Sequence, residues 1–256
     1  VRGYTTLHLT TEPEEGYIFT SWENYDPETG LIVTSDTAVT AVFTAIADLP
    51  VEYYAVFEDE HTLTLRYDNL RQTLDKTWQM EDLTLEERIQ ITRIEIAPSV
   101  AQATIPTLYN YFSGMPNLAV VEGLQYINTS TISDVSFMFF NCPALKSIDL
   151  TGFDLSNVTS AAGMFMGCTN LTTITCKADY TALAGSNSAG MFDGCTSLVG
   201  GMGTTYNPAH KDASYARPDR GTDAPGYFTY TGTFTVTATV TPEEAGKIYF
   251  NHSGGF

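Results

Sequence analysis

Four cysteines are the residues of this sequence best suited to metal or redox chemistry. They are Cys142, Cys168, Cys176 and Cys195, and none of them forms a Cys-x-x-Cys pair. A zinc site needs about four clustered ligands, whereas the four histidines are scattered along the chain. Three of the cysteines recur at one position of a repeat, which is typical of a small buried apolar residue. We therefore interpret all four as core residues and expect no metal and no cofactor.

Three acidic residues form the pattern that best suggests a binding site. Alignment of three expected strands places Glu95, Glu122 and Asp149 at equivalent outward positions. Neighbouring strands lie about 4.8 Å apart, so these carboxylates would form a row that favours a calcium ion or a basic partner. The alternative is a solvated face on which acidic residues are simply tolerated. Paired carboxylates also suggest a glycosidase, but a flat strand face is a poor place for one, so we do not expect an enzyme.

A repeat positions these residues. The motif Met-Phe-x-x-Cys-x-x-Leu begins at residues 138, 164 and 191, so its period is 26 or 27 residues, and a degenerate copy precedes it at 111–118. A second element, of the form Leu-x-x-Ile-x-Leu, occupies residues 145–150 and is matched at 91–96 and 171–176. Its alternation is that of a half-buried strand. A unit of this length with one short strand cannot close a core alone, so neighbouring units must stack.

This pattern predicts an α+β repeat fold. We expect a short leucine-rich-repeat solenoid with parallel strands and short helical turns, one of them over residues 159–167. Alternation over residues 51–68 predicts a β-hairpin that caps its N-terminal end. The expected domains are a partial β-repeat module over 1–48, the capped solenoid over 49–230 and the start of a second β-repeat module over 231–256. Both ends lie inside strand-like runs, so we interpret the sequence as part of a longer chain.

Two sets of motifs resemble known families. Residues 51 to 230 resemble the leucine-rich-repeat domain of BspA-like bacterial surface proteins of the Bacteroidetes type, through the repeated motif above and the string Ile-Asp-Leu-Thr-Gly-Phe-Asp-Leu-Ser-Asn-Val-Thr at 148–159. The pieces Gly-Tyr-x-Phe-x-x-Trp at 16–22 and Val-Thr-Ala-x-Phe at 39–43 resemble divergent internalin-type B-repeats, and 236–243 looks like the opening strand of another. These resemblances imply an extracellular or cell-surface location and a role in adhesion.

Charge and hydropathy limit the classes of partner that this protein can bind. The formal net charge is −18, and charged residues make up only 16% of the chain. Phosphate backbones and anionic membrane surfaces are bound through clusters of Lys and Arg, so we expect no nucleic acid. No apolar run approaches the roughly 20 residues of a membrane helix, so we expect no membrane insertion in this stretch of chain.

The sequence therefore predicts a secreted or cell-surface recognition module, a monomer that binds a host extracellular protein, a glycan or another bacterium without catalysis. The outward strand face would present the contact residues Arg93, Glu95, Glu122, Ser147, Asp149, Thr173 and Thr175. One alternative is a structural spacer in a multi-repeat ectodomain. Another is a carbohydrate-binding module. A cleft lined by paired carboxylates or by Trp22 or Trp78 would support that alternative.

Overall fold

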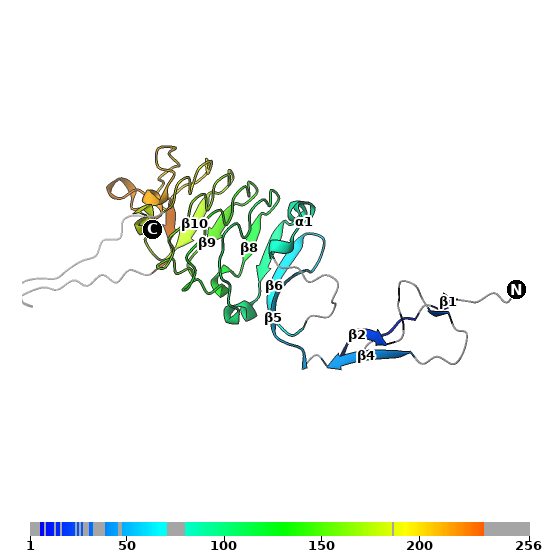
Figure 1. Cartoon of the computed structure of the whole chain (residues 1–256). Helices are drawn as coiled ribbons and strands as arrows, with labels where there is room; N and C mark the ends of the chain where they lie inside the picture. The colour runs from blue at the N-terminus through cyan, green and yellow to red at the C-terminus, as the bar shows by residue number, and fades with distance from the viewer. Residues whose placement is uncertain are drawn as a thin grey trace, which may run out of the picture.

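A computed structural model shows a stack of short coils, with pairs of strands beyond its N-terminal end (Figure 1). The structure describes residues 6–7, 9–12, 14–15, 17–23, 25, 27, 31–32, 39–45, 48–70, 80–185 and 187–232. Trp78 and residues 233–256, which contain nearly all of the predicted second β-repeat module, lie outside this part of the chain.

The N-terminal strands form two antiparallel pairs. β1 (Thr6–Leu7) pairs with β3 (Leu31–Ile32), and β2 (Tyr17–Glu23) pairs with β4 (Thr40–Ala45) with a register shift between Phe19 and Ser21. The ring of Trp22 packs against Phe19 at 5.3 Å and against Tyr25 at 5.0 Å, so Trp22 belongs to a small aromatic cluster of its own module.

A four-stranded mixed sheet begins the stack. Its strands are β5 (Glu52–Phe57), β6 (Thr62–Asp68), β7 (Arg93–Ile96) and β8 (Val120–Glu122), in that order. β5 and β6 form an antiparallel hairpin where the alternation over residues 51–68 predicts one, whereas β6–β7 and β7–β8 are parallel. Asp59 closes the hairpin turn because its Oδ1 accepts hydrogen bonds from the backbone N–H groups of His61 and Thr62, both at 2.7 Å.

A three-stranded parallel sheet continues the stack. Its strands are β9 (Ser147–Asp149), β10 (Thr173–Cys176) and β11 (Phe228–Tyr230), with β10 in the middle. Parallel bridges from Asp134 to Ser160 and from Ser160 to Asn187 join successive repeats outside these strands.

Regular helix is scarce in the described residues. The only α-helix is α1 (Leu85–Gln90), which starts at a capping box formed by Thr84 and Glu87. The remaining helical turns are the 3₁₀ segments η2 (Met80–Asp82), η3 (Pro98–Gln102), η4 (Leu124–Tyr126), η5 (Thr181–Gly185), η6 (Ala213–Tyr215) and η7 (Gly221–Asp223).

The predicted fold class, an α+β leucine-rich-repeat solenoid with helical turns, is wrong. Among the described residues the strands form four small sheets, two of them mixed or parallel and two antiparallel, instead of one continuous parallel sheet, and one helix of six residues is the only α-helix. The regular secondary structure of the described residues is therefore mostly β. The segment 159–167, where a helical turn was expected, consists of turns, because Gly163 and Gly167 have φ values of +58° and +82°. Left-handed residues cannot continue a right-handed helix.

Left-handed residues recur twice in every repeat. The first position is occupied by Asn110, Phe137, Gly163 and Gly190, and the second by Gly114, Asn141, Gly167 and Gly194. Glycine adopts this conformation without strain, and Gly163 also lacks room for a side chain, since an added Cβ would lie 2.5 Å from Cε1 of Phe137. The turns between strands are therefore set by backbone conformation at fixed places in the repeat.

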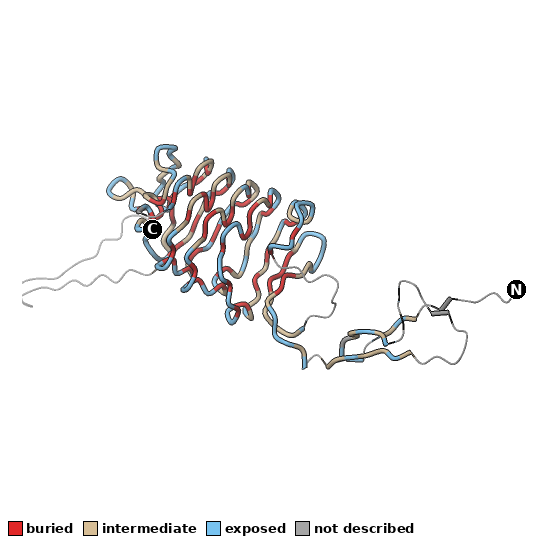
Figure 2. Tube along the Cα trace, viewed as in Figure 1, coloured by how far each residue is buried: buried red, intermediate tan, exposed pale blue. Residues whose placement is uncertain are grey.

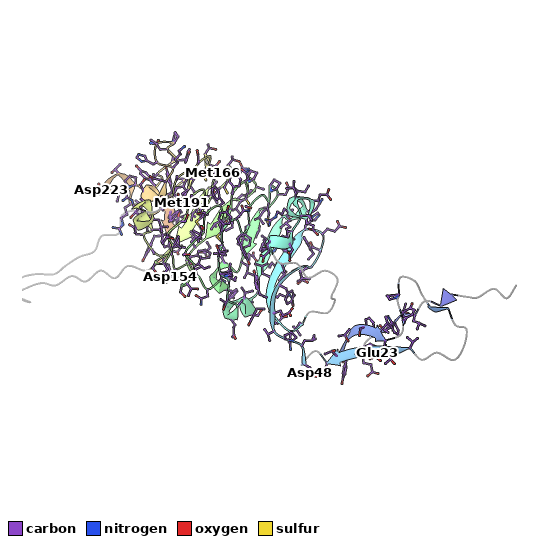
Figure 3. All side chains as sticks on the ribbon, viewed as in Figure 1. Glu23, Asp48, Asp154, Met166, Met191 and Asp223 are labelled. Atoms are coloured by element: carbon purple, nitrogen blue, oxygen red, sulfur yellow. The ribbon has the colours of Figure 1, made fainter. Side chains whose placement is uncertain are left out.

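The core runs along the inside of the stack (Figure 2). One phenylalanine from each repeat is fully buried, and the four rings of Phe112, Phe139, Phe165 and Phe192 stack with centroids 5.4, 5.7 and 5.8 Å apart. Phe112 follows Tyr111, and the other three rings follow the buried methionines Met138, Met164 and Met191. Figure 3 labels Met191 among the side chains of the stack. The repeated Met and Phe are therefore core residues of the stack.

Candidate functional site

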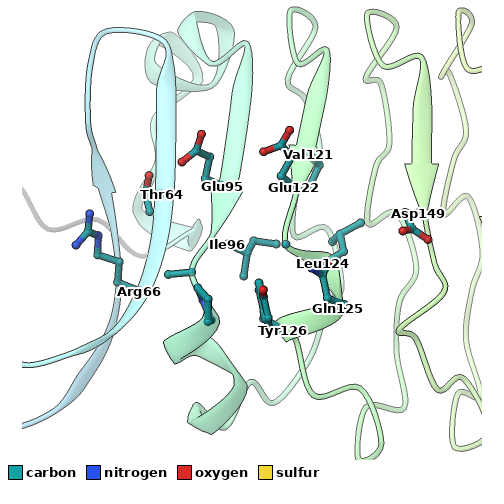
Figure 4. Close-up of a pocket in the computed structure, with 13 residues that line it drawn as sticks. Thr64, Arg66, Glu95, Ile96, Val121, Glu122, Leu124, Gln125, Tyr126 and Asp149 are labelled. Atoms are coloured by element: carbon teal, nitrogen blue, oxygen red, sulfur yellow. The ribbon is translucent and has the colours of Figure 1, made fainter.

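The residues predicted to bind a ligand lie on the outward side of the parallel strands. The strand register places Thr64 of β6 beside Glu95 of β7, and Glu95 beside Glu122 of β8. Figure 4 shows the side chains of Glu95 and Glu122 next to each other and pointing away from the strands. The pairing of these two carboxylates, predicted from the sequence, is present in the structure.

Arg93 lies between the two carboxylates and binds both. Its Nε donates to Oε1 of Glu95 at 2.7 Å, and its Nη2 donates to Oε2 of Glu122 at 2.5 Å. The hydrogen bond to Glu95 and the charge of Glu122 raise the pKa of Arg93, so the guanidinium is the cation of this pair. One oxygen of each carboxylate remains for an outside donor, because a carboxylate has two.

Asp149 is not paired with Glu122 in the way that Glu122 is paired with Glu95, because β8 and β9 belong to different sheets. Its Oδ1 accepts hydrogen bonds from the backbone N–H of Thr151 and from Oγ1 of Thr175, both at 2.9 Å. Burial by itself would raise the pKa of Asp149, but these hydrogen bonds and the charge of Lys177 outweigh it and lower the pKa. The carboxylate is therefore ionised and fixed in orientation at neutral pH.

The other predicted contact residues extend the same face across the second sheet. Ser147 pairs with Thr173, and Asp149 pairs with Thr175 in the parallel register of β9 and β10. Ser147 is exposed, and Thr173 is half-buried. The seven predicted residues are thus divided between two sheets, with Arg93, Glu95 and Glu122 on the first and the remaining four on the second.

A hollow of about 740 Å³ connects the two groups (Figure 4). Its polar wall includes Glu95, Glu122 and Asp149, and its lining also includes Ile96, Ala97, Pro98, Val121, Gly123 and Leu124. Four further residues were not found by the sequence reasoning and also line it, namely Thr64, Arg66, Gln125 and Tyr126. Thr64 and Arg66 alternate with the core residues of β6, so their outward position could have been predicted from the sequence. Gln125 and Tyr126 reach the hollow only through the 3₁₀ turn η4, which the sequence did not predict.

Two buried polar atoms in this hollow have no hydrogen-bond partner. They are Oγ1 of Thr64 and Nε of Arg66, and they are the only such side-chain atoms in the described part of the chain. Thr64 is 6% exposed. The other end of Arg66 is engaged, because its Nη2 donates to Oε1 of Glu58 at 2.6 Å, and this ion pair raises the pKa of Arg66 against the opposing effect of burial.

The structure offers little for metal or thiol chemistry. No group of three or more His, Cys, Asp or Glu side chains among the described residues could hold a metal ion. All four cysteines are free and buried, which confirms their interpretation as core residues. Each of Cys142, Cys168 and Cys195 donates its S–H to the backbone carbonyl of a core phenylalanine one repeat earlier, at 3.0 to 3.1 Å. Burial raises the pKa of Cys142 and Cys195 to about 12, which keeps these thiols protonated and unreactive.

The fold and this face define a β-rich repeat protein with an open polar surface along its strands. A family model described as "Mycoplasma protein of unknown function, DUF285" matches residues 103–211. That segment contains the three copies of Met-Phe-x-x-Cys-x-x-Leu, and the match is compatible with a BspA-like surface repeat protein. Comparison with curated proteins and with solved structures gave no match. Within the described residues no helix has both the length and the apolarity to cross a membrane.

Proposed function

We propose that this protein is a non-catalytic recognition module of a BspA-like surface protein, and that it binds its partner through the strand face around Glu95, Glu122 and Asp149. The observation that carries the proposal is the mutual fixing of these polar side chains. Arg93 holds Glu95 and Glu122, and Thr175 holds Asp149. Side chains that are already ordered lose little entropy on binding, so such a face is suited to recognition.

The absence of catalysis is part of this proposal. A glycosidase needs one carboxyl that stays protonated near neutral pH to act as the acid. Arg93 already occupies one oxygen of Glu95 and one of Glu122. The geometry of the pair is therefore suited to accepting further hydrogen bonds.

We extend the proposal to location and context. We propose a secreted or cell-surface protein of the Bacteroidetes type, with internalin-type B-repeats beside the repeat stack, that acts as a monomer in adhesion. The motif resemblance supports this context, and the family match is compatible with a surface repeat protein. The partner is a host extracellular protein, a glycan or a surface component of another bacterium.

A binding screen of the whole chain tests the proposal. The chain is immobilised and exposed to host matrix proteins and to a glycan panel, and each hit is repeated with Glu95, Glu122 and Asp149 all changed to Ala. The matched control changes three exposed acidic residues outside the hollow, Glu15, Glu60 and Asp223, to Ala, so that the net charge changes equally. We expect the first variant to lose each hit and the control to keep it.

Two outcomes would contradict the proposal. A hit that survives the first variant unchanged would place binding elsewhere on the molecule. A chain that binds neither proteins nor glycans would instead support the alternative of a structural spacer.

A further inference from the structure

The hollow beside β8 contains an unusual imbalance of hydrogen-bonding groups. Buried polar side-chain atoms are nearly always hydrogen-bonded in folded proteins, because an unpaired one destabilises the fold. The two exceptions in the described residues, Oγ1 of Thr64 and Nε of Arg66, both line this one hollow. Their shared location suggests that a ligand, rather than another part of the protein, completes their hydrogen bonds.

The same wall contains two carboxylates that each have one oxygen engaged by Arg93. Among the described residues, Arg93 binds one oxygen of Glu95 and one of Glu122, which leaves the second oxygen of each open to a donor. The register of the parallel strands places Thr64, Glu95 and Glu122 side by side in this wall. A ligand in the hollow must therefore supply an acceptor to Arg66 and donors to the carboxylates within a short distance.

This requirement separates the chemical classes of ligand. A lysine ammonium group has donors but no acceptor, so it would leave Nε of Arg66 unpaired. A phosphate or carboxylate has acceptors only, and it would be repelled by Glu95, Glu122 and Asp149 in a chain with a net charge of −18. A hydroxyl group donates once and accepts twice, so a molecule with several neighbouring hydroxyl groups satisfies both needs.

The size and the apolar part of the hollow agree with such a ligand. Its volume of about 740 Å³ lies within the range of small-molecule sites, roughly 300–1,000 Å³. The half-buried ring of Tyr126 lies below the carboxylates with Leu124 (Figure 4), and Pro98 adds to the apolar lining. A sugar ring presents both kinds of surface, hydroxyl groups around its edge and C–H groups on its faces.

We infer that the hollow binds a neutral sugar unit of a glycan, with Thr64, Arg66, Glu95 and Glu122 as its hydrogen-bonding partners and Tyr126 against its C–H face. This inference rests on the proposed recognition function and specifies the ligand class of the same face. Oγ1 of Thr64 and Nε of Arg66 belong to residues that line the hollow, and each atom has less than 1 Å² exposed. A ligand hydroxyl can reach them only after a side-chain movement, and we infer that this movement is a rotation of Arg66, which is 34% exposed, away from Glu58.

Thr64→Val gives the sharpest test because binding and stability should respond in opposite ways. Valine has nearly the same shape as threonine and removes the unpaired hydroxyl, so the free protein should melt at the same or a higher temperature. The loss of one ligand hydrogen bond should weaken glycan binding by about tenfold or more. Glu122→Gln should also weaken binding, because it removes a charged acceptor. The control is Thr169→Val, which changes an exposed threonine outside the hollow and should alter neither quantity.

The experiment uses the full chain on two arrays of immobilised oligosaccharides. The first carries neutral glycans that end in glucose, galactose, mannose or N-acetylglucosamine, and the second carries sialylated and sulfated glycans. Binding to neutral glycans that falls in Thr64→Val and Glu122→Gln, with melting temperature retained, supports the inference.

Several outcomes would overturn it, and they separate it from the broader proposal. Neutral-glycan binding that is unchanged in Thr64→Val and Glu122→Gln would place the sugar elsewhere. Binding only to acidic glycans, or only to host matrix proteins through the same strand face, would refute the neutral sugar and leave the recognition function standing. Failure to bind any glycan or matrix protein would contradict both the neutral-sugar inference and the recognition function.

Discussion

The rings of Phe139 and Phe165 are stacked almost parallel, with centroids 5.7 Å apart and planes 5° apart. They occupy the same place in successive repeats, and the backbone N–H of Phe139 donates to the carbonyl of Met164 at 2.8 Å. Side-chain packing and backbone hydrogen bonds therefore join the two repeats at one point. The same relationship connects Phe165 to Phe192, with centroids 5.8 Å apart and planes again 5° apart.

Phe165→Ala should destabilise the protein by about 3–5 kcal/mol, the usual cost of removing a fully buried phenylalanine. Phe165 is 0% exposed and has a stacked ring on either side, so the cavity cannot collapse without moving both neighbours. Urea unfolding followed by fluorescence measures the change. Phe140→Ala is the control, because Phe140 is only half-buried and should cost clearly less. Equal costs for the two variants would show that the stacked rings are not the main contact between repeats.

Gly163→Ala should destabilise the protein more than Gly114→Ala. Both glycines have a positive φ, +58° and +65°, which by itself costs an alanine about 1–2 kcal/mol. At Gly163 the new Cβ would also lie 2.5 Å from Cε1 of Phe137, whereas at Gly114 no atom lies within 4 Å of it. Thermal unfolding of both variants measures the difference. If both variants have the same melting temperature, the close approach of Phe137 to Gly163 does not occur in solution.

Asp219 should make the C-terminal end of the stack sensitive to acid. Its carboxylate is 7% exposed and accepts hydrogen bonds from the backbone of Met202, Thr204 and Gly221 and from Oγ1 of Thr204, at 2.7 to 3.0 Å. Burial would raise the pKa of Asp219, but these hydrogen bonds outweigh it and lower the pKa. A lowered folded pKa means that the stabilisation is complete above the unfolded value, about 4, and is lost as the pH falls through the folded value.

Asp219→Asn tests this origin of the acid sensitivity. The amide replaces one acceptor oxygen by a donor, so unfolding free energy at pH about 7 should fall by roughly 1.5–3 kcal/mol. The variant should also lose less stability than the wild type between pH about 5 and about 3, which urea titrations at both pH values measure. An identical pH dependence in the two proteins would assign the acid sensitivity to other carboxylates.

Calcium should not stabilise the wild-type protein, because Arg93 already supplies a cation to Glu95 and Glu122. Arg93→Gln leaves two neighbouring carboxylates without that cation, and like charges at this spacing repel. Millimolar calcium should then raise the melting temperature of this variant but not of the wild type. Arg220→Gln, which removes an exposed cation outside the hollow, is the control. A calcium-dependent shift in the wild type would show that the acidic row binds the ion despite Arg93.

Much of the core was predictable from the sequence because the buried positions recur with a regular period. The interior of each repeat must accept the same shapes as its neighbours, so methionine, phenylalanine and cysteine recur at fixed spacing, and Met164, Phe165 and Cys168 are all 0% exposed. The strands at 93–96, 147–149 and 173–176 also lie within the segments predicted from alternation.

The helical turns were predicted wrongly although the sequence contained a signal against them. Glycines at 163, 167, 190 and 194 recur at the spacing of the repeat, and each has a positive φ. Such a recurrence indicates a required left-handed turn. An aromatic residue, Phe137, takes the same conformation in an earlier repeat, which no propensity would predict.

The sequence by itself determined the period of the repeat, its buried residues and the outward direction of Glu95, Glu122 and Asp149, because these follow from spacing along one strand. Only the tertiary structure decided what these carboxylates meet. The parallel register brings Arg93 of β7 to Glu122 of β8, and the separation of the two sheets opens the hollow that Thr64, Arg66 and Tyr126 line. Long side chains reach across strands, so pairing and cavity shape depend on distances between segments that no pattern along a single strand contains.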